Sequence, residues 1–221
     1  MNGTVRPRVK ICCISSVEEA RMAIDCGASA VGLVSAMPSG PGILTEDQIS
    51  EIASTVPPPI ATFLLTSRTD AKEIIKQQQQ THVNTLQLCN RMPTEELRAL
   101  HLALPNVRLV QVIHVAGADS LPQALAVEPF VDALLLDSGA PQALVPELGG
   151  TGRVHDWKVS LEIRERVDVP VFLAGGLKAG NVREAISTVA PFALDVCTGV
   201  RTRGRLDHDK LKQFFAAAWA N

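Results

Sequence analysis

Aromatic residues are scarce in this sequence, which has no tyrosine, two tryptophans and six phenylalanines among 221 positions. Proteins that hold single-stranded nucleic acid stack its bases on aromatic side chains, and this chain supplies few of them. Positive charge is not in excess either, since 21 Lys and Arg residues face 23 Asp and Glu residues and leave a net charge of −2. Neither nucleic acid nor an acidic membrane surface is therefore an expected partner.

Long apolar segments are also absent. No stretch approaches the ~18 apolar residues that cross a bilayer, and the N-terminal MNGTVRPRVKICC lacks the continuous apolar core of a secretion signal. The cysteines form no CxxC pair and no cluster with histidine, which argues against a metal site and for reduced thiols in a cytoplasmic protein. They are Cys12, Cys13, Cys26, Cys89 and Cys197. With 46% hydrophobic residues, the chain can still bury a large core.

What the sequence does contain is a regular alternation of two kinds of segment. Short apolar runs, typical of buried strands, occupy residues 8–14, 29–34, 60–65, 83–88, 107–115, 131–136, 169–173 and 192–197. Amphipathic stretches with helical spacing follow them, near residues 17–26, 45–56, 69–80, 94–104, 119–127, 157–166, 181–189 and 207–219. Strict alternation predicts a parallel sheet with crossover helices, and eight units can close into a single-domain (β/α)8 barrel over residues 1–221. The alternative is an open doubly wound sheet, but the glycine-rich turn that such a sheet usually has after its first strand is missing.

In such a barrel, ligands bind where strands end and the following loops begin. The last three of these loops are rich in glycine, which lets backbone N–H groups approach an anion closely. We therefore predict that they bind a phosphate monoester, and the residues concerned are Gly150, Gly152, Gly175, Gly176, Thr198 and Gly199. The alternative is that these glycines only form tight turns.

Two residues at strand ends have the chemistry of an acid–base pair. Asp137 ends the run LLLD, where apolar surroundings can raise its pKa for general acid catalysis, although an aspartate that only stabilises the loop is the alternative. Cys12 lies beside Lys10 and can act as a base or nucleophile, although most free cysteines are simply small buried hydrophobic residues. Lys10 and Asp195, on the first and eighth runs, are added to the predicted substrate-binding residues. Neighbouring side chains of a strand face opposite sides, so Cys13 should point away from Cys12 unless the strand has already ended.

Several motifs follow one another over nearly the whole chain. They are VKIC (Val9–Cys12), GASAVGLV (Gly27–Val34), LQL (Leu86–Leu88), LLLD (Leu134–Asp137), GGTG with DW (Gly149–Gly152, Asp156-Trp157), LAGGL with NV (Leu173–Leu177, Asn181-Val182), and PFALDV with TGV (Pro191–Val196, Thr198–Val200). The order and spacing of GGTG, DW, LAGGL and the final TGV resemble those of the phosphoribosylanthranilate isomerase family, the (β/α)8 enzymes of tryptophan biosynthesis.

The resemblance implies an Amadori rearrangement of N-(5′-phosphoribosyl)anthranilate that needs no cofactor and no metal. In that family an aspartic acid protonates the furanose ring oxygen, the ring opens to a Schiff base, and a cysteine thiolate removes the C2′ proton. By motif, the acid corresponds to Asp137 and the base to Cys12. The implied partner is a small phosphorylated sugar, bound by a monomer or a homodimer.

This chain departs from the family pattern at several positions. The family's KICG is here KICC, with Cys13 in place of glycine; its QLHG becomes QLCN; and its SSGVE becomes CTGVR. The arginine that binds the anthranilate carboxylate in the family is replaced by Pro41, which has neither charge nor donor. Arg91 and Arg201 are candidates to take over that contact.

These departures leave two alternatives beside the isomerase. One is a divergent paralogue that keeps the barrel and ring-opening chemistry but acts on another phosphorylated ribosyl or aminosugar compound. The other is a non-catalytic barrel that binds a phosphorylated metabolite, which the presence of both Cys12 and Asp137 argues against. Fold alone does not decide between them, because function depends on the site.

Overall fold

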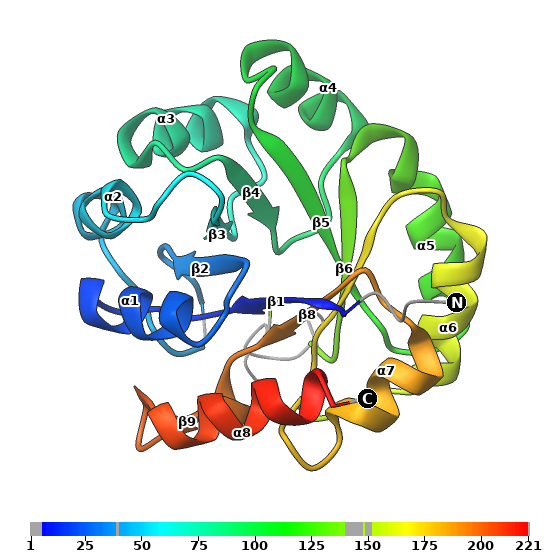
Figure 1. Ribbon diagram of the computed structural model, residues 1–221. Coiled ribbons are helices and arrows are strands. Elements are labelled where there is room, and N and C mark those ends of the chain that lie inside the picture. Colours follow the sequence, from blue (N-terminus) through cyan, green and yellow to red (C-terminus); the bar gives the residue numbers. More distant parts are fainter. Residues whose placement is uncertain (1–5, 39, 140–147, 149–151, 221) are drawn as a thin grey trace.

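The computed structural model describes residues 6–38, 40–139, 148 and 152–220. In this part of the chain, eight parallel strands form a closed barrel, and helices surround it (Figure 1). The strands are β1 (Arg8–Ile11), β2 (Ala30–Val34), β3 (Ala61–Thr66), β4 (Thr85–Leu88), β5 (Arg108–His114), β6 (Ala133–Asp137), β7 (Val171–Leu173) and β8 (Ala193–Val196). Each strand pairs with its neighbours in sequence, and β1 pairs with β8 to close the ring. The predicted (β/α)8 barrel is therefore confirmed.

The helices begin and end close to where the amphipathic pattern predicts. They are α1 (Val17–Asp25), α2 (Glu46–Ser54), α3 (Ala71–Thr81), α4 (Thr94–Ala103), α5 (Ser120–Val127), α6 (Trp157–Arg166), α7 (Val182–Val189) and α8 (His208–Ala218). Side-chain caps fix several starts, because they satisfy N–H groups that have no partner within the helix. Ser16 caps α1, Thr45 forms a capping box with Gln48 on α2, and Asp207 caps α8. Within the described residues, none of these helices combines the length and apolarity that a membrane span requires.

Buried apolar side chains form two layers, as the alternation along a strand requires. Outward-facing residues such as Ile11 and Leu33 pack against the helices in the larger core. Inward-facing residues such as Phe63, Val112 and Phe172 fill the barrel itself. Because of this alternation, Lys10 and Cys12 face the inside of the barrel.

A short hairpin near the end of the chain lies outside the predicted pattern. It consists of β9 (Arg201–Thr202) and β10 (Arg205–Leu206), joined by Arg203 and Gly204, both with positive φ. Positive φ at both central residues suits the twist of a two-residue hairpin. Two single-turn 3-10 helices, η1 (Glu128–Phe130) and η2 (Thr198–Val200), were also not predicted, because elements of two or three residues carry no periodicity.

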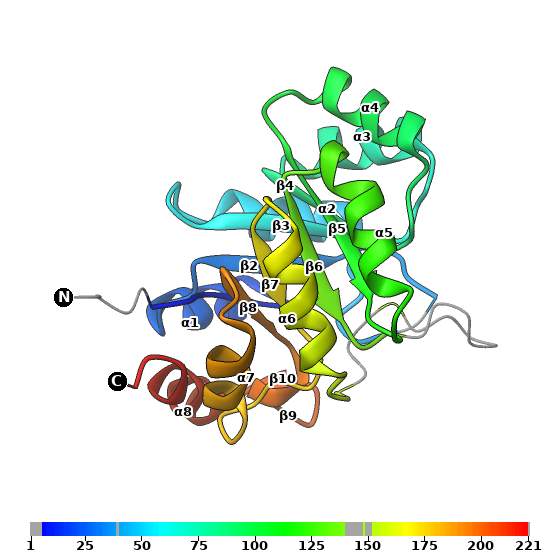
Figure 2. The same ribbon diagram turned by 90° about the vertical axis from the view of Figure 1, so that its right-hand side faces the viewer.

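All the barrel strands point the same way, so the barrel has two distinct ends. Figure 2 shows that β1 begins and α8 ends on one side, at the left of the view. The carboxyl ends of the strands share the opposite side. The loops at that side carry the binding residues of such barrels.

Candidate active site

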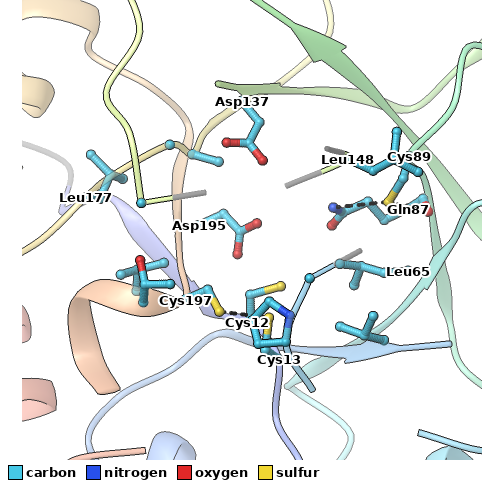
Figure 3. Close-up of a pocket in the computed structure, with 18 of the residues that line it drawn as sticks. Cys12, Cys13, Leu65, Gln87, Cys89, Asp137, Leu148, Leu177, Asp195 and Cys197 are labelled. Carbon is cyan, nitrogen blue, oxygen red and sulfur yellow. Dashed lines mark hydrogen bonds between the residues drawn. The ribbon is translucent and has the colours of Figure 1, made fainter. Parts of the chain in front are cut away.

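A cavity lies at the carboxyl end of the barrel and is partly open to solvent (Figure 3). The structure brings most of the predicted site residues together around it, namely Cys12, Asp137, Gly152, Gly175, Gly176, Asp195 and Thr198. Gly150 lies outside the described residues, and neither Lys10 nor Gly199 is among the residues that line the cavity.

Asp137 ends β6 and points into the cavity (Figure 3). Its side chain is buried, and burial raises the pKa of this carboxyl above its ordinary value; the nearby Asp195 carboxylate raises it further. A hydrogen bond from the Ser138 backbone N–H to Oδ1, at 2.7 Å, opposes that shift and fixes the carboxyl group. A buried carboxyl group held in this way can keep its proton and donate it as a general acid.

Cys12 lies across the cavity from Asp137, directly after β1 (Figure 3). Lys10, two residues earlier, is fully buried and donates to Asp195 Oδ1 at 2.9 Å. Burial opposes the charge on Lys10, but Asp195 outweighs it and raises the pKa of Lys10 above its ordinary value. The nearby Cys12 sulfur also contributes to that shift. A buried ammonium group thus stands near the Cys12 thiol.

Lys10 therefore acts through Asp195 and does not line this cavity. Its side chain pairs with Asp195, lies 5.2 Å from the ring centre of Phe63, and is among the residues that line a separate cavity at the amino end of the barrel. The predicted contact between Lys10 and the substrate has no support from this position. Asp195, which Lys10 holds in place, does line the cavity.

Gly32 is a residue that the sequence analysis did not select. A methyl group added to it would lie 3.0 Å from Cys12 Sγ and 3.1 Å from Lys10 Nζ. Such separations are tighter than most real contacts of a Cβ atom, so an added methyl group would require the side chains of Cys12 and Lys10 to shift by a few tenths of an ångström. Its place in the motif GASAVGLV carried no signal for this role, because the contact joins different strands.

The glycine-rich loops converge on the cavity beside these residues. Gly152, Gly175 and Gly176 all have positive φ, which an L side chain rarely adopts. A Cβ at Gly176 would lie 2.7 Å from the Arg153 backbone, and one at Gly199 would lie 1.9 Å from the Leu177 carbonyl oxygen. The loops after β6, β7 and β8 thus pack backbone against backbone, and glycine is required where they touch. Exposed N–H groups in such loops can bind an anion.

Cys13 meets the exception stated for the alternation of side chains along a strand, because the strand ends before it. The strand β1 ends at Ile11, and Cys13 adopts a left-handed conformation with φ 61°. This turn brings its side chain back to the same cavity that Cys12 lines. A left-handed residue with a side chain costs about 1–2 kcal/mol relative to glycine, which explains why the related motif has glycine there.

Arg201 is not available to bind a substrate carboxylate. It is buried and forms two hydrogen bonds of 3.1 Å with Glu19, and it also donates to the backbone carbonyls of Cys12, Cys13 and Gly204. Burial opposes the charges of both partners, but their mutual hydrogen bonds raise the pKa of Arg201 and lower the pKa of Glu19. Arg201 therefore stabilises the turn that follows β1, through its hydrogen bonds to the carbonyls of Cys12 and Cys13.

The other candidate, Arg91, is exposed and lines a separate cavity beside β4 and β5. No Lys or Arg side chain is among the described residues that line the Cys12–Asp137 cavity, whereas Pro41 is. Neither arginine thus occupies the place of the family's carboxylate-binding arginine.

Gln87 is, after Gly32, a second residue of the site that was not predicted from the sequence. It lines the cavity, is only 4% exposed, and its Oε1 accepts no hydrogen bond from the described residues. Its amide nitrogen lies 3.9 Å from Cys89 Sγ. A buried acceptor without a partner costs free energy, so Gln87 is suited to receive a hydrogen bond from a bound ligand. Its position inside the apolar run LQL was the available signal.

Comparison with known proteins gives one consistent result. The model of a protein family described as N-(5′-phosphoribosyl)anthranilate isomerase matches residues 9–217. The N-(5′-phosphoribosyl)anthranilate isomerase of Methanocella arvoryzae is 36% identical over 198 residues, covering 90% of this chain and 91% of the relative. The isomerase of the same name from Halorubrum lacusprofundi is 34% identical and covers 96% of each chain.

Solved structures agree with this. The crystal structure of phosphoribosylanthranilate isomerase from Thermotoga maritima superposes with a TM-score of 0.83 at 30% identity, covering 96% of this chain and 98% of that one. A phosphoribosylanthranilate isomerase in complex with reduced 1-(o-carboxyphenylamino)-1-deoxyribulose 5-phosphate gives a TM-score of 0.80 at 29% identity, with the same coverage. Monomers generated from the dimeric Thermotoga maritima enzyme give 0.80 at 28% identity, again with the same coverage.

Proposed function

The chain belongs to the N-(5′-phosphoribosyl)anthranilate isomerase family, and from this premise we propose that it performs the family's Amadori rearrangement in tryptophan biosynthesis. The substrate is N-(5′-phosphoribosyl)anthranilate and the product is the corresponding 1-deoxyribulose 5-phosphate. The observation that carries the proposal is the pairing, across one cavity, of a buried carboxyl group with a raised pKa and a thiol beside a buried ammonium group.

Each step has a group suited to it. Asp137 donates its proton to the furanose ring oxygen, the C1′–O bond breaks, and a Schiff base forms between C1′ and the anthranilate nitrogen. Cys12, as thiolate, then removes the proton from C2′. The resulting enolamine becomes the ketone of the product. Asp195, held by Lys10, supplies a fixed negative charge between the acid and the base.

The phosphate group anchors the substrate away from the reacting carbons. Backbone N–H groups of the loops that contain Gly152, Gly175, Gly176 and Gly199 are suited to bind it, together with Thr198. Binding at a remote group positions the ribose for reaction, which is how enzymes gain rate from parts of a substrate that do not react. We propose further that the protein acts in the cytoplasm, as a monomer or a homodimer.

The alternative of a divergent paralogue, suggested by Pro41, is not favoured. The relatives from Methanocella arvoryzae and Halorubrum lacusprofundi, which align with 90% or more of this chain, carry the isomerase name. Carboxylate recognition without the arginine then depends on neutral donors, among which the Gln87 amide is a cavity-lining candidate.

The test is turnover of freshly generated phosphoribosylanthranilate, followed by the loss of anthranilate-type fluorescence. We expect turnover by the unmodified protein, and its loss in both Cys12→Ala and Asp137→Ala. If the unmodified protein shows no turnover but still binds ribose 5-phosphate, the substrate assignment is wrong and the loop around Pro41 has adapted the site to another aglycone.

A further inference from the structure

The cavity contains an unusual number of thiols. Cys12, Cys13, Cys89 and Cys197 all line it, and only Cys12 has a part in the proposed reaction. Two of the others touch: Cys13 Sγ and Cys197 Sγ are 2.8 Å apart, as the dashed line in Figure 3 marks. All five cysteines are free thiols in this structure.

The contact between Cys13 and Cys197 lies where β1 and β8 close the barrel. Cys13 follows β1 and Cys197 follows β8, and these two strands pair in register from Arg8 with Ala193 to Ile11 with Val196. The Cys12 N–H continues the pairing to the Val196 carbonyl at 2.9 Å. The left-handed conformation of Cys13 then turns its side chain toward Cys197. Both residues are thus held by the barrel itself, although 184 positions separate them in sequence.

The two thiols differ in their surroundings. Hydrogen bonding with Cys13 lowers the pKa of Cys197, as does the charge of Arg201, although burial opposes this. Hydrogen bonding with Cys12 and Cys197 and burial raise the pKa of Cys13. Cys197 is also the more exposed of the two. It is therefore the sulfur suited to react first, because the accessible thiolate is the nucleophile in thiol chemistry.

We propose that Cys13 and Cys197 form a reversible oxidation site, distinct from the catalytic thiol, in which a peroxide converts the two thiols into a disulfide that joins β1 to β8. The Cys197 thiolate attacks one peroxide oxygen, so that an S–O bond forms, the O–O bond breaks and hydroxide leaves. The Cys13 sulfur then attacks the Cys197 sulfur: an S–S bond forms, the S–O bond breaks, and the leaving hydroxyl group takes the Cys13 thiol proton and departs as water. The sulfur pair loses two electrons, and the peroxide is reduced to water.

The geometry requires little movement for this step. A disulfide needs its sulfurs about 2.05 Å apart, so the pair must close by less than an ångström from its present 2.8 Å. The bond would close a loop of nearly the whole chain, and cross-links over long loops restrict the unfolded state most. Oxidation is therefore expected to stabilise the barrel. This inference does not depend on the proposed isomerase activity.

The experiment treats the intact protein with hydrogen peroxide and then blocks, counts and maps its thiols after denaturation. We expect the number of free thiols to fall from five to three, a cross-linked peptide containing Cys13 and Cys197, and full recovery on addition of dithiothreitol. The thermal unfolding midpoint should rise by about 5–15 °C. Unchanged thiol counts, a cross-link through Cys12 or Cys89, or an unchanged midpoint in the cross-linked protein would each overturn the proposal.

Variants separate this pair from the other cysteines. Cys13→Gly removes both the thiol and the left-handed strain, and it should abolish the cross-link and the rise in midpoint. Cys26→Ser, at the end of α1 and away from the cavity, should leave both unchanged. In Cys12→Ser the cross-link should still form, because the catalytic thiol takes no part in it; its loss in that variant would mean that oxidation passes through Cys12.

Discussion

The two ends of the barrel both contain a cavity, and the larger one is at the end that carries no proposed chemistry. The cavity at the amino end has a volume of about 490 Å³ and the one at the carboxyl end a volume of about 60 Å³. The amino end also has charges: Arg108 pairs with Asp132, and Arg8 lies over the ring of Phe192. Neither size nor the presence of charge therefore identifies the functional end.

The difference lies in how the polar groups are held. At the amino end, Arg108 is 68% exposed, and an ion pair in such a position is worth little. At the carboxyl end, Asp137 and Asp195 are buried, Gln87 has an acceptor without a partner, and Cys13 is held in a strained conformation. Buried carboxyl groups, an unpaired acceptor and a strained residue each cost stability, and such features persist where function requires them. They distinguish a functional site from a cavity without function.

The largest expected effect comes from removing the acid or the base. Cys12→Ala and Asp137→Asn should each lower kcat by about 10²–10⁴-fold, because each removes a proton-transfer group. Arg108→Ala, at the amino end, should leave kcat unchanged. Steady-state rates on phosphoribosylanthranilate check all three variants. An equal loss of kcat in Arg108→Ala would contradict the assignment of catalysis to the carboxyl end of the barrel.

Removing one buried cation should cost far more stability than removing an exposed one. Lys10→Met leaves Asp195 buried without its counterion and should lower the free energy of unfolding by about 3–5 kcal/mol. Arg108→Met should cost less than about 1 kcal/mol. Urea unfolding measures both, and adding Asp195→Asn to Lys10→Met should recover most of the loss. If Lys10→Met and Arg108→Met lose similar amounts of unfolding free energy, Lys10 is not a buried partner of Asp195.

A smaller loss is expected where the barrel interior has no room. Gly32→Ala should lower the free energy of unfolding by about 1–3 kcal/mol, because the new methyl group crowds Cys12 and Lys10 and requires them to shift by a few tenths of an ångström. It should also lower kcat, since Cys12 must move. Gly180→Ala is the matched control, because nothing lies within 4 Å of its Cβ position. Thermal unfolding and turnover are measured for both variants. If Gly32→Ala is as stable and as active as the wild type, Gly32 is not crowded by Cys12 and Lys10.

The smallest expected effect is a gain in stability. The raised pKa of Asp137 means that the folded state disfavours the carboxylate relative to the unfolded state. The contribution of Asp137 to stability is therefore present below the unfolded pKa, near 3.8, and is lost as the pH rises through the folded pKa. Asp137→Asn, which can still accept the Ser138 N–H, should thus be more stable at neutral pH by about 0.5–2 kcal/mol.

That gain should disappear as the pH falls well below the unfolded pKa near 3.8, where the wild-type carboxyl group is protonated in both states. Unfolding curves of the two proteins across this range provide the check. A gain that does not change with pH would mean that packing, not ionisation, separates the variant from the wild type.

The sequence predicted the barrel well because its signals are local and periodic. The strand Val171–Leu173 and the helix Trp157–Arg166, for example, lie within or coincide with the predicted segments. It failed where a side chain's role depends on a contact across strands. The roles of Gly32 and Arg201 are defined by residues far away in the chain, and the direction of Cys13 depends on where β1 ends. Periodicity contains no information about such contacts.

The most direct test of the account is a crystal structure of this protein with reduced 1-(o-carboxyphenylamino)-1-deoxyribulose 5-phosphate. We expect the ligand to occupy the carboxyl-end cavity, with its phosphate on the glycine-rich loops around Gly152, Gly176 and Thr198 and its sugar carbons between Cys12 and Asp137. We also expect that no arginine contacts the ligand carboxylate. A ligand bound at the amino end, or one whose sugar carbons lie out of reach of both Cys12 and Asp137, would contradict it.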